Sequence, residues 1–409
     1  MGSALSRQLT HRFFRYLAIT SQSDPRVNTL PSTPGQHDMA RELAQELAQL
    51  GLDDIVIDEY ATVTAVKKGN VAGAPRIGFI THIDTVDVGL SPDIHPQILK
   101  FTGEDLCLNK EKSIWLRVKE HPEILAYPGE EIIFSDGTSV LGADNKAAVT
   151  VVMTLLENLT PEHQHGDIVV AFVPDEEIGL CGAKALDLNR FDVDFAWTID
   201  CCELGEIVYE NFNAASAVFR ITGVSVHPGS AKDTMVNALK LACEIDGMLP
   251  PREVPEHTEG REGFFHMDAL SGDTAAARLE YIVRDHDREK FEARKELLRG
   301  VEKAMTEKYP TARVELALKD SYYNMLEQIR PCMHLIDNAK KACEAAGVQW
   351  FEEATRGGTD GARLSYMGLP CPNLGTGGHN FHGPYECITA ESMDKAVEII
   401  LNIIALYAA

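Results

Sequence analysis

The stretch RIGFITHIDT (residues 76–85) joins a short apolar run directly to a histidine and an aspartate. DIVVAFVPDEE (167–177) joins a second apolar run to three acids, and FAWTID (195–200) joins a third run to one aspartate. Runs of this length and composition are typical of strands buried on both faces of a parallel sheet. Because binding sites in open parallel sheets form beyond the carboxyl ends of the strands, the three stretches predict one site at one sheet edge.

Helical and strand patterns alternate around these runs in the first half of the chain. Apolar residues at helical spacing predict helices over 5–20, 38–51 and 145–156, with Asp38 as the N-cap and Gly51 as the stop of the second helix. A further short apolar run, at 55–57, predicts another strand. The alternation indicates an α/β domain with a mostly parallel sheet.

The pattern changes near residue 211. It predicts strands over 214–222, 275–284 and 312–318, helices over 235–248 and 289–308, and a polar loop over 250–263. That order indicates a small α+β sandwich inserted into the larger domain, whose alternation resumes near residue 325 with helices over 335–346 and 391–406. We therefore predict a main domain in two parts, 1–211 and 323–409, and an inserted domain, 212–322.

Composition limits the class of protein. The 409 residues include 38 Lys plus Arg and 62 Asp plus Glu, a formal net charge of -24, which argues against binding nucleic acid or anionic membranes. No apolar stretch reaches the roughly 18 residues of a membrane span, and the first residues lack the cationic and apolar segments of an export signal. The nine cysteines are odd in number and lack metal-finger spacing, which indicates reduced thiols. These features predict a soluble cytoplasmic protein.

Each residue at the strand ends can be interpreted either as part of a functional site or as having a structural role alone. His82 and Asp84 share one side of a strand, so a carboxylate could hold one ring nitrogen while the other binds metal; alternatively His82 is a satisfied core histidine and Asp84 starts a turn. Glu176 and Glu177 are either one metal ligand and one general base, or two acids of a solvated loop. Asp144 precedes a predicted helix and suits both an N-cap and a metal carboxylate.

Two glycine-rich loops lie far along the chain. RGGTDG (356–361) carries an arginine and GTGGHNFHG (375–383) carries two histidines. Glycine lets the backbone approach a ligand closely, but neither loop matches the phosphate-binding motifs, so nucleotide binding is disfavoured. In the insert, VHPG (226–229) presents His227 on a turn, where an exposed loop residue is the alternative.

With these motifs in view, the chain resembles the peptidase T branch, the tripeptide aminopeptidases, of the dinuclear zinc aminopeptidase and carboxypeptidase superfamily. The resemblance covers nearly the whole chain. Four motifs mark the superfamily: THID (81–84), GAD (142–144), PDEEIG (174–179) and NFHG (380–383). Four narrower motifs favour the branch: ENFNAA (210–215), HPG (227–229), SYYNM (321–325) and RGGTDG (356–361).

The resemblance implies a role for each candidate residue. His82 and Asp200 would bind one zinc, Glu177 and His382 the other, and Asp144 would bridge the two. Asp84 would orient His82, and Glu176 would be the general base for hydrolysis by a hydroxide shared between two zinc ions. The substrate would be bound by His227, Arg356 and Asn380. Two Zn2+ per subunit are expected, and Co2+ or Mn2+ would suit the same ligands.

The sequence departs from the branch pattern at a few positions. Cys201 and Cys202 stand where glycines are usual; they are thiols that could perturb the site or remain inert side chains. His379 stands where an aromatic residue is more usual, which raises the question of which imidazole is the ligand. We choose His382 because it precedes Gly383 and lies four residues before Glu386, the H-x-x-x-E spacing of the family.

The function implied is that of a zinc-dependent aminopeptidase that releases the N-terminal residue of tripeptides. Small peptides would be its substrates, and its inserted domain would act as a lid and form a homodimer, with His227 reaching the partner's site. A related deacylase or dipeptidase, acting on N-acyl amino acids or dipeptides, is the nearest alternative. A binding protein that kept the fold and lost the chemistry is a third, disfavoured by the complete ligand set with Glu176.

Overall fold

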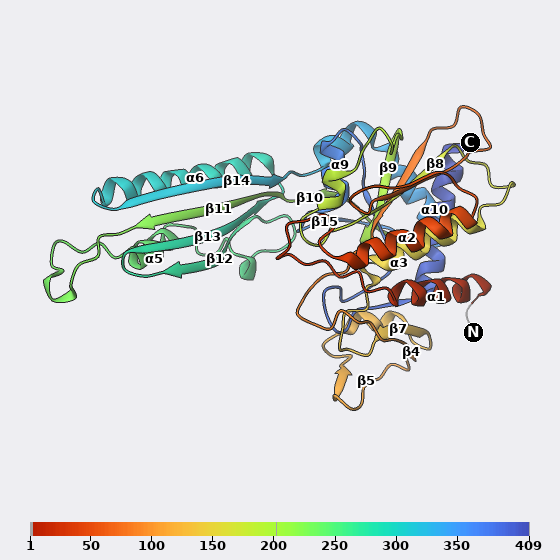
Figure 1. Cartoon of the computed structure of the whole chain (residues 1–409), viewed down its shortest axis with the longest axis horizontal. Helices are drawn as coiled ribbons and strands as arrows, with labels where there is room; N and C mark the ends of the chain where they lie inside the picture. The colour runs from red at the N-terminus through yellow and green to blue at the C-terminus, as the bar shows by residue number, and fades with distance from the viewer. Residues whose placement is uncertain (1–2, 202, 409) are drawn as a thin grey trace. The chain divides into compact units, whose positions relative to one another are not determined.

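The structure, a computed structural model, describes residues 3–201 and 203–408 (Figure 1). It divides into two compact units. Unit 1 comprises Met1–Tyr209, Gln328–Glu353 and Thr359–Ala409, and unit 2 comprises Glu210–Glu327 and Ala354–Gly358. The predicted insert, 212–322, therefore falls within unit 2, which also takes in a short segment from the glycine-rich loop at 356–361.

Unit 1 is built on an eight-stranded sheet in the order β1-β2-β8-β3-β9-β16-β10-β15. The strands are β1 (Asp53–Ile57), β2 (Val63–Lys67), β3 (Ile77–His82), β8 (Ile168–Val173), β9 (Phe195–Cys201), β10 (Glu206–Asn211), β15 (Phe351–Thr355) and β16 (Asn373–Gly375). Strand β3 pairs in parallel with both β8 and β9, and β9 pairs in parallel with β16, while β1, β2 and β10 make antiparallel pairs. This confirms the predicted α/β fold with a mostly parallel sheet.

Helices cover both faces of this sheet. On one face, Val169, Ala171 and Val173 of β8 share a core with α4 (Cys181–Ala185) and α9 (Asp360–Tyr366). On the other, Phe79 stacks on Trp197 with ring centroids 5.9 Å apart, and Trp197 contacts Tyr407 of α10. The bounds of the helices on that side are α1 (Ala4–Leu17), α3 (Ala143–Asn158), α8 (His334–Ala345) and α10 (Ala390–Ala408).

Helix α3 is the centre of its layer. It packs against α1, α10, β3 and β9, and almost every side chain from Ala143 to Leu156 is buried. Its Lys146 is buried as well: the ammonium donates to the carbonyl of Tyr16, in the last turn of α1, at 3.2 Å and to that of Ile19, just after α1, at 2.6 Å. Burial lowers the pKa of Lys146 to about 7.

Helix α2 (Pro34–Gln49) starts earlier than the sequence predicts. Thr33 is its N-cap residue and Pro34 stands at the first helical position, where the fixed φ of proline suits a helix start. Asp38 therefore lies inside the helix, and its predicted role as N-cap is wrong. Gly51, with a φ of 71°, follows the C-cap Leu50, as expected of the stop.

A small additional layer is formed by residues between β3 and α3. Strands β4 (Pro96–Lys100) and β7 (Glu131–Ser135) form a three-stranded antiparallel sheet with β17 (Cys387–Thr389), and β5 (Leu106–Asn109) pairs with β6 (Ile114–Leu116). Phe101, Ile132 and Phe134 lie in its core. The sequence patterns did not predict this layer.

Unit 2 is a four-stranded antiparallel sheet, β12-β13-β11-β14, with two helices packed on it. Its elements are β11 (Asn213–Thr222), α5 (Ala238–Gly247), β12 (Phe264–Gly272), β13 (Ala276–Asp285), α6 (Arg288–Lys308) and β14 (Arg313–Tyr322). Alternate residues of β11 and β13, such as Phe219 and Tyr281, share a core with α5 and α6. The predicted α+β insert is confirmed in type, but strand β12 was missed.

Three buried asparagines tie together the two places where the chain crosses into and out of unit 2. The Oδ1 atom of Asn211 accepts the N–H of Met325 at 2.7 Å, and Oδ1 of Asn324 accepts the N–H of Asn211 at 3.2 Å. Asn213 in turn accepts the N–H of Asn324 at 3.0 Å. The motifs ENFNAA and SYYNM thus meet through their asparagines.

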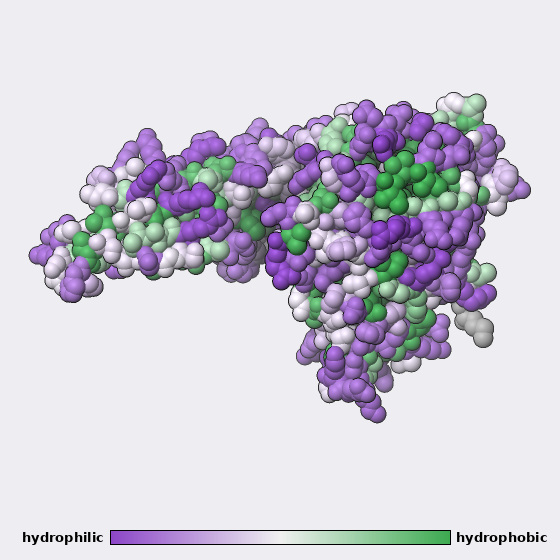
Figure 2. Space-filling view, viewed as in Figure 1, coloured by the Kyte–Doolittle hydropathy of each residue, from purple (hydrophilic) through white to green (hydrophobic). Residues whose placement is uncertain are grey.

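The visible face of both units is mostly hydrophilic, with apolar patches on unit 1 (Figure 2). Within residues 3–201 and 203–408, no helix combines the length and apolar character needed to cross a bilayer.

Candidate metal centre

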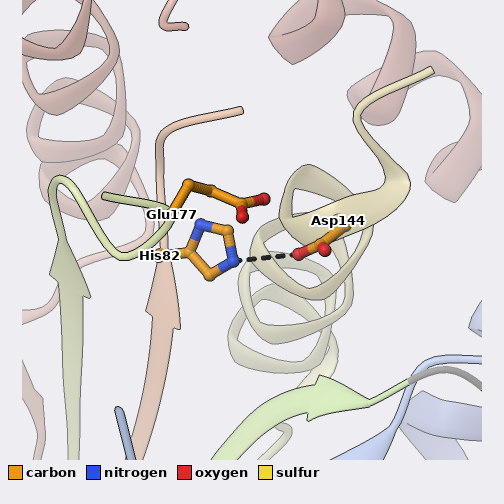
Figure 3. A group of neighbouring side chains, drawn as sticks. All are labelled: His82, Asp144 and Glu177. Atoms are coloured by element: carbon orange, nitrogen blue, oxygen red, sulfur yellow. Dashed lines mark hydrogen bonds and ion pairs between the residues drawn. The ribbon is translucent and has the colours of Figure 1, made fainter. Parts of the chain in front are cut away.

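The three predicted strand ends meet at one edge of the unit 1 sheet. β3 ends at His82, and its two neighbours are β8, which runs into residues 174–177, and β9, which contains Asp200. Because these three strands are parallel, their carboxyl ends fall together. Figure 3 shows His82, Asp144 and Glu177 converging from β3, α3 and the loop after β8, and one ligand atom of each lies within 4.8 Å of the others.

The imidazole of His82 is buried and held from both sides. Its Nε2 atom lies 2.9 Å from Oδ1 of Asp144 and 3.5 Å from Oδ1 of Asp200. Its Nδ1 atom lies 3.1 Å from the carbonyl oxygen and 3.3 Å from Oδ1 of Asp84. A proton on Nδ1 would satisfy Asp84 and leave the Nε2 lone pair facing the two other carboxylates, which is the arrangement of a ligating histidine.

Asp144 lies between two imidazoles. It stands at the start of α3 with non-helical φ and ψ of -82° and 102°, so its side chain is not directed as in a regular first turn. Its Oδ1 atom faces His82, while its Oδ2 atom lies 3.2 Å from Nε2 of His382. The same Nε2 of His382 lies 3.1 Å from Oε2 of Glu177. One carboxylate thus has one oxygen for each histidine.

The donors at this edge fit divalent metal ions. Two imidazole Nε2 atoms face the carboxylates of Asp144, Asp200 and Glu177, and Oε1 of Glu177 is buried without a hydrogen-bond partner among the described residues. Imidazole and carboxylate ligands suit Zn2+, and also Co2+ and Mn2+. A cation would relieve the repulsion between the acids and give the unpaired oxygen a partner.

Burial and neighbouring charges shift the pKa values of the groups in this cluster. Burial, with the charge of Asp144, raises the pKa of Glu177 to about 7; burial raises that of Asp200 to about 6. Hydrogen bonds to Asp144 and Glu177 raise the pKa of His382 to about 10. Without metal, protons compensate the negative charge of this cluster.

Asp84 and Glu176 lie beside this cluster. The carboxylate of Asp84 is buried and accepts the backbone N–H of Glu176 at 3.0 Å and that of Glu177 at 3.3 Å. Burial raises the pKa of the Glu176 side chain well above its usual value, and the charges of Asp200 and Asp360 raise it further. Glu176 is therefore a carboxyl group that readily holds a proton.

The structure distinguishes the two histidines of the glycine-rich loop. Nε2 of His379 lies 2.6 Å from the hydroxyl of Tyr127, and the ring is buried. His382, with a φ of 60°, instead places its Nε2 on Asp144 and Glu177. This geometry favours His382 over His379 as the ligand.

The predicted substrate-binding residues are less closely grouped. Asn380 lies in unit 1, where its Nδ2 donates to Glu123 at 2.6 Å and its Oδ1 lies 3.2 Å from Nδ1 of His121. His227 and Arg356 lie in unit 2. His227 is on an exposed turn and accepts the N–H of Gly229 at 3.1 Å.

The guanidinium of Arg356 already makes hydrogen bonds within unit 2. Its Nη1 donates to the carbonyls of Gly260 at 2.8 Å and Glu262 at 3.1 Å, and its Nη2 donates to the hydroxyl of Thr258 at 2.9 Å. Its cationic carbon lies near the rings of Phe212 and Phe264. The guanidinium has five N–H groups, so the bonds to described residues leave Nε and one hydrogen of Nη2 available to a ligand.

Two acids near the site have environments that the sequence did not predict. Glu386 is buried and accepts three backbone N–H groups from the segment that carries Asp144. Asp360, at the start of α9, is also buried, and its Oδ1 lacks a hydrogen-bond partner among the described residues. Burial, with the charges of Asp200 and Asp84, raises the pKa of Asp360 to about 8. Cys202 and the side chain of Cys201 lie outside what the structure describes, so their predicted influence stays a prediction.

Comparisons with known proteins all find similarity to peptidases. Residues 142–406 match the sequence profile of "Peptidase family M20/M25/M40". The chain is 59% identical over 403 residues to a "Peptidase T-like protein" of Yersinia pestis, covering 98% of each chain. It is 48% identical to "Peptidase T" of Clostridium novyi over 98% of this chain and 99% of the relative.

Solved structures share the fold. The crystal structure of aminopeptidase PepT from Bacillus cereus superposes with a TM-score of 0.80 at 21% identity, covering 99% of both chains. That of a tripeptidase from Staphylococcus aureus superposes with a TM-score of 0.79, also at 21% identity, covering 98% of both.

Proposed function

Since the chain belongs to peptidase family M20/M25/M40 and to its peptidase T-like members, we propose that it is a metalloaminopeptidase that cleaves the N-terminal peptide bond of tripeptides. The observation that carries this proposal is the carboxylate of Asp144, which gives one oxygen to each of two imidazoles. A carboxylate placed in this way could serve two adjacent metal ions at once. The name of the Clostridium novyi relative supports the substrate class.

His82 and Asp200 would hold one zinc, Glu177 and His382 would hold the other, and Asp144 would serve both. This assignment is supported by the contacts of the two Nε2 atoms. Two divalent ions held there would supply charge that polarises the scissile carbonyl and lowers the pKa of a bound water. Asp84 would keep His82 in the ligating tautomer by accepting from Nδ1.

Glu176 would act as the general base. Its carboxylate takes the proton of the attacking water and later gives it to the leaving amine, so no covalent intermediate is needed. The direction of its pKa shift supports this role, because a raised pKa makes the Glu176 carboxylate a stronger base toward the proton of water. Asp84 fixes the backbone of this residue and of its neighbour Glu177.

Arg356, Asn380 and His227 are our candidates for binding the peptide. Arg356 retains N–H groups that could pair with a terminal carboxylate. His227 is exposed on its turn, with Nδ1 accepting the N–H of Gly229, and its Nε2 could stabilise the developing oxyanion, from the unit 2 of a second subunit if the chain forms a homodimer. Unit 2 would then be a lid and dimerisation domain, and cytoplasmic location stays a prediction from the sequence.

A panel of substrates tests this function. The purified protein, loaded with Zn2+, Co2+ or Mn2+, is assayed with dipeptides, tripeptides, tetrapeptides, N-acetylated tripeptides and N-acyl amino acids. We expect turnover of tripeptides with release of the N-terminal residue, and none of the N-acetylated forms. Exclusive turnover of N-acyl amino acids or of dipeptides would assign the chain to a related deacylase or dipeptidase instead.

The variant Glu176→Gln separates catalysis from binding. It should retain both metals and lose at least 100-fold in kcat, since general acid–base catalysis contributes about 10²–10⁴-fold. Metal retention is measured by elemental analysis on the same sample. A protein that binds peptide and metal with no turnover by either form would be a binding protein rather than an enzyme.

A further inference from the structure

The loop that carries His382 is closed at its base and fixed along its length. His379 and Cys387 exchange two backbone hydrogen bonds, of 2.9 and 3.0 Å, so the loop returns to where it started. Within it, Asn380 and His382 both adopt left-handed backbone conformations, with φ of 58° and 60°. His382 therefore sits on a loop of defined conformation although its own side chain is about half exposed, at 48%.

Glu386, in the same loop, binds the backbone of another segment. Its Oε2 accepts the N–H of Leu141 at 2.7 Å and of Gly142 at 2.8 Å, and its Oε1 accepts the N–H of Asp144 at 2.9 Å. The side chain is 1% exposed, so water does not compete for these bonds. All three distances are those of well-formed N–H···O hydrogen bonds.

Of these three N–H groups, only that of Asp144 belongs to helix α3; those of Leu141 and Gly142 lie just before it. The first N–H groups of a helix lack acceptors within the helix, and a preceding side chain usually caps them. Helix α3 has no such cap: its N-cap residue is Gly142, with a φ of 77° and no side chain to offer. For the N–H of Asp144, Glu386 supplies the missing side-chain acceptor from 242 residues further along the chain, and its other two bonds hold the residues that lead into the helix.

We propose that Glu386 is a positioning residue that couples the two metal positions. It holds Asp144, which faces both His82 and His382, and it belongs to the same loop as His382. Loss of its carboxylate would release the shared ligand and the loop together. This inference rests on the dinuclear site of the proposed function, and it assigns to Glu386 no contact with metal or substrate.

The inference predicts that replacing Glu386 changes metal binding in a different way from replacing a metal ligand. His382→Ala should remove one of two metal equivalents. Glu386→Gln should instead weaken both, each by about 10- to 100-fold, the range found for residues that support metal ligands. Glu386→Asp, which keeps the carboxyl group on a shorter side chain, should lie between Glu386→Gln and the wild type.

Zinc titration in metal-buffered solution, with bound metal measured by elemental analysis, tests this pattern without an activity assay. Amide hydrogen exchange at residues 141, 142 and 144 is followed in the same samples and should be faster in Glu386→Gln. Glu46→Gln is the matched control, because Glu46 is also a buried, multiply bonded carboxylate of unit 1, on α2. It should lower the melting temperature and leave both zinc affinities unchanged.

Two results would overturn the inference. One is two zinc equivalents of wild-type affinity in Glu386→Gln; the other is loss of a single equivalent, as in His382→Ala. If Glu386→Gln does not fold, Glu386→Asp supplies the same comparison. A wild-type protein that binds no divalent metal would overturn the proposed function as well, which separates the two failures.

Discussion

The carboxylate of Asp84 accepts the backbone N–H of Glu176 at 3.0 Å. Asp84 follows β3 and Glu176 follows β8, so this bond joins the ends of two neighbouring strands. The same carboxylate accepts the N–H of Glu177 and lies 3.3 Å from Nδ1 of His82. One side chain thus fixes an imidazole and the backbone of both glutamates.

Replacing Asp84 by Asn should therefore weaken metal binding and catalysis together. The amide keeps one acceptor oxygen and presents an NH2 group to an N–H, so one of the two backbone bonds is lost. We expect metal affinity to fall by about 10- to 100-fold and kcat to fall even at saturating zinc. Zinc titration and steady-state kinetics measure both. Asp87→Asn, at a partly exposed position of the loop that follows, is the control, and an equal effect of the two substitutions would contradict this role for Asp84.

His382 and His379 should differ in their effect on metal content. His382→Ala removes an Nε2 atom that faces Asp144 and Glu177, so the protein should keep one zinc equivalent of two. His379→Ala removes a hydrogen bond to Tyr127 and should keep both metals, with a loss of about 1 kcal/mol in stability. Elemental analysis after dialysis measures the metal content. The reverse pattern would identify His379 as the ligand.

Arg356→Lys should raise the KM for tripeptides with a free carboxyl terminus by about 10-fold, because a lysine cannot form two parallel bonds to a carboxylate. The KM for the C-terminal amide of the same peptide should change little. Arg261→Lys, in the neighbouring loop and paired with Glu210, serves as the control. A similar KM change for both peptides, or a lower melting temperature alone, would show that Arg356 only supports the loop at 258–262.

Glu46 gives a prediction about pH and stability. Burial tends to raise its pKa, but hydrogen bonds from Arg15 and Tyr16 and the charge of Arg12 outweigh burial, so the pKa lies below the usual 4.5. A carboxyl group whose pKa is lowered by folding stabilises the protein above its unfolded pKa, and that contribution disappears as the pH falls through the folded value. Glu46→Gln should cost about 3 kcal/mol at pH 7.

The difference between wild type and Glu46→Gln should begin to shrink below about pH 4.5, where Glu46 of the unfolded chain becomes protonated, and should disappear as the pH falls through the lower pKa of the folded state. Urea unfolding between pH 3 and pH 8 measures it. A difference in the free energy of unfolding that stays constant across this range would mean that the charge of Glu46 does not contribute to stability.

The sequence predicted the strand ends because β3 and β8 are buried on both faces. Such strands appear as unbroken apolar runs, and the acids or histidine that follow them mark the sheet edge. β12 and β15 gave no such signal, because each is an edge strand with many exposed residues. Their sequences, FFHMDALSG and FEEAT, mix apolar and charged residues without a clear period.

The sequence could predict the side chains of the candidate site but not their contacts with the backbone. The spacing of His382 and Glu386 is visible in the sequence, but the partners of Glu386 are backbone N–H groups 242 to 245 positions away. Every residue except proline has such a group, so these contacts leave no trace in the sequence. The sequence likewise cannot show that the ring of His379 turns toward Tyr127, because spacing does not fix the direction of a side chain on a loop.

Lys146 has a consequence for any shortened form of the protein. Its ammonium is buried two residues beyond Asp144, and its acceptors are two carbonyls at positions 16 and 19. Proteolytic trimming or a truncation that removes the first twenty residues would leave this charge in the interior with neither acceptor. The N-terminal helix is therefore not a dispensable extension. Its loss would destabilise the start of α3, which carries Asp144, the carboxylate between the two metal positions.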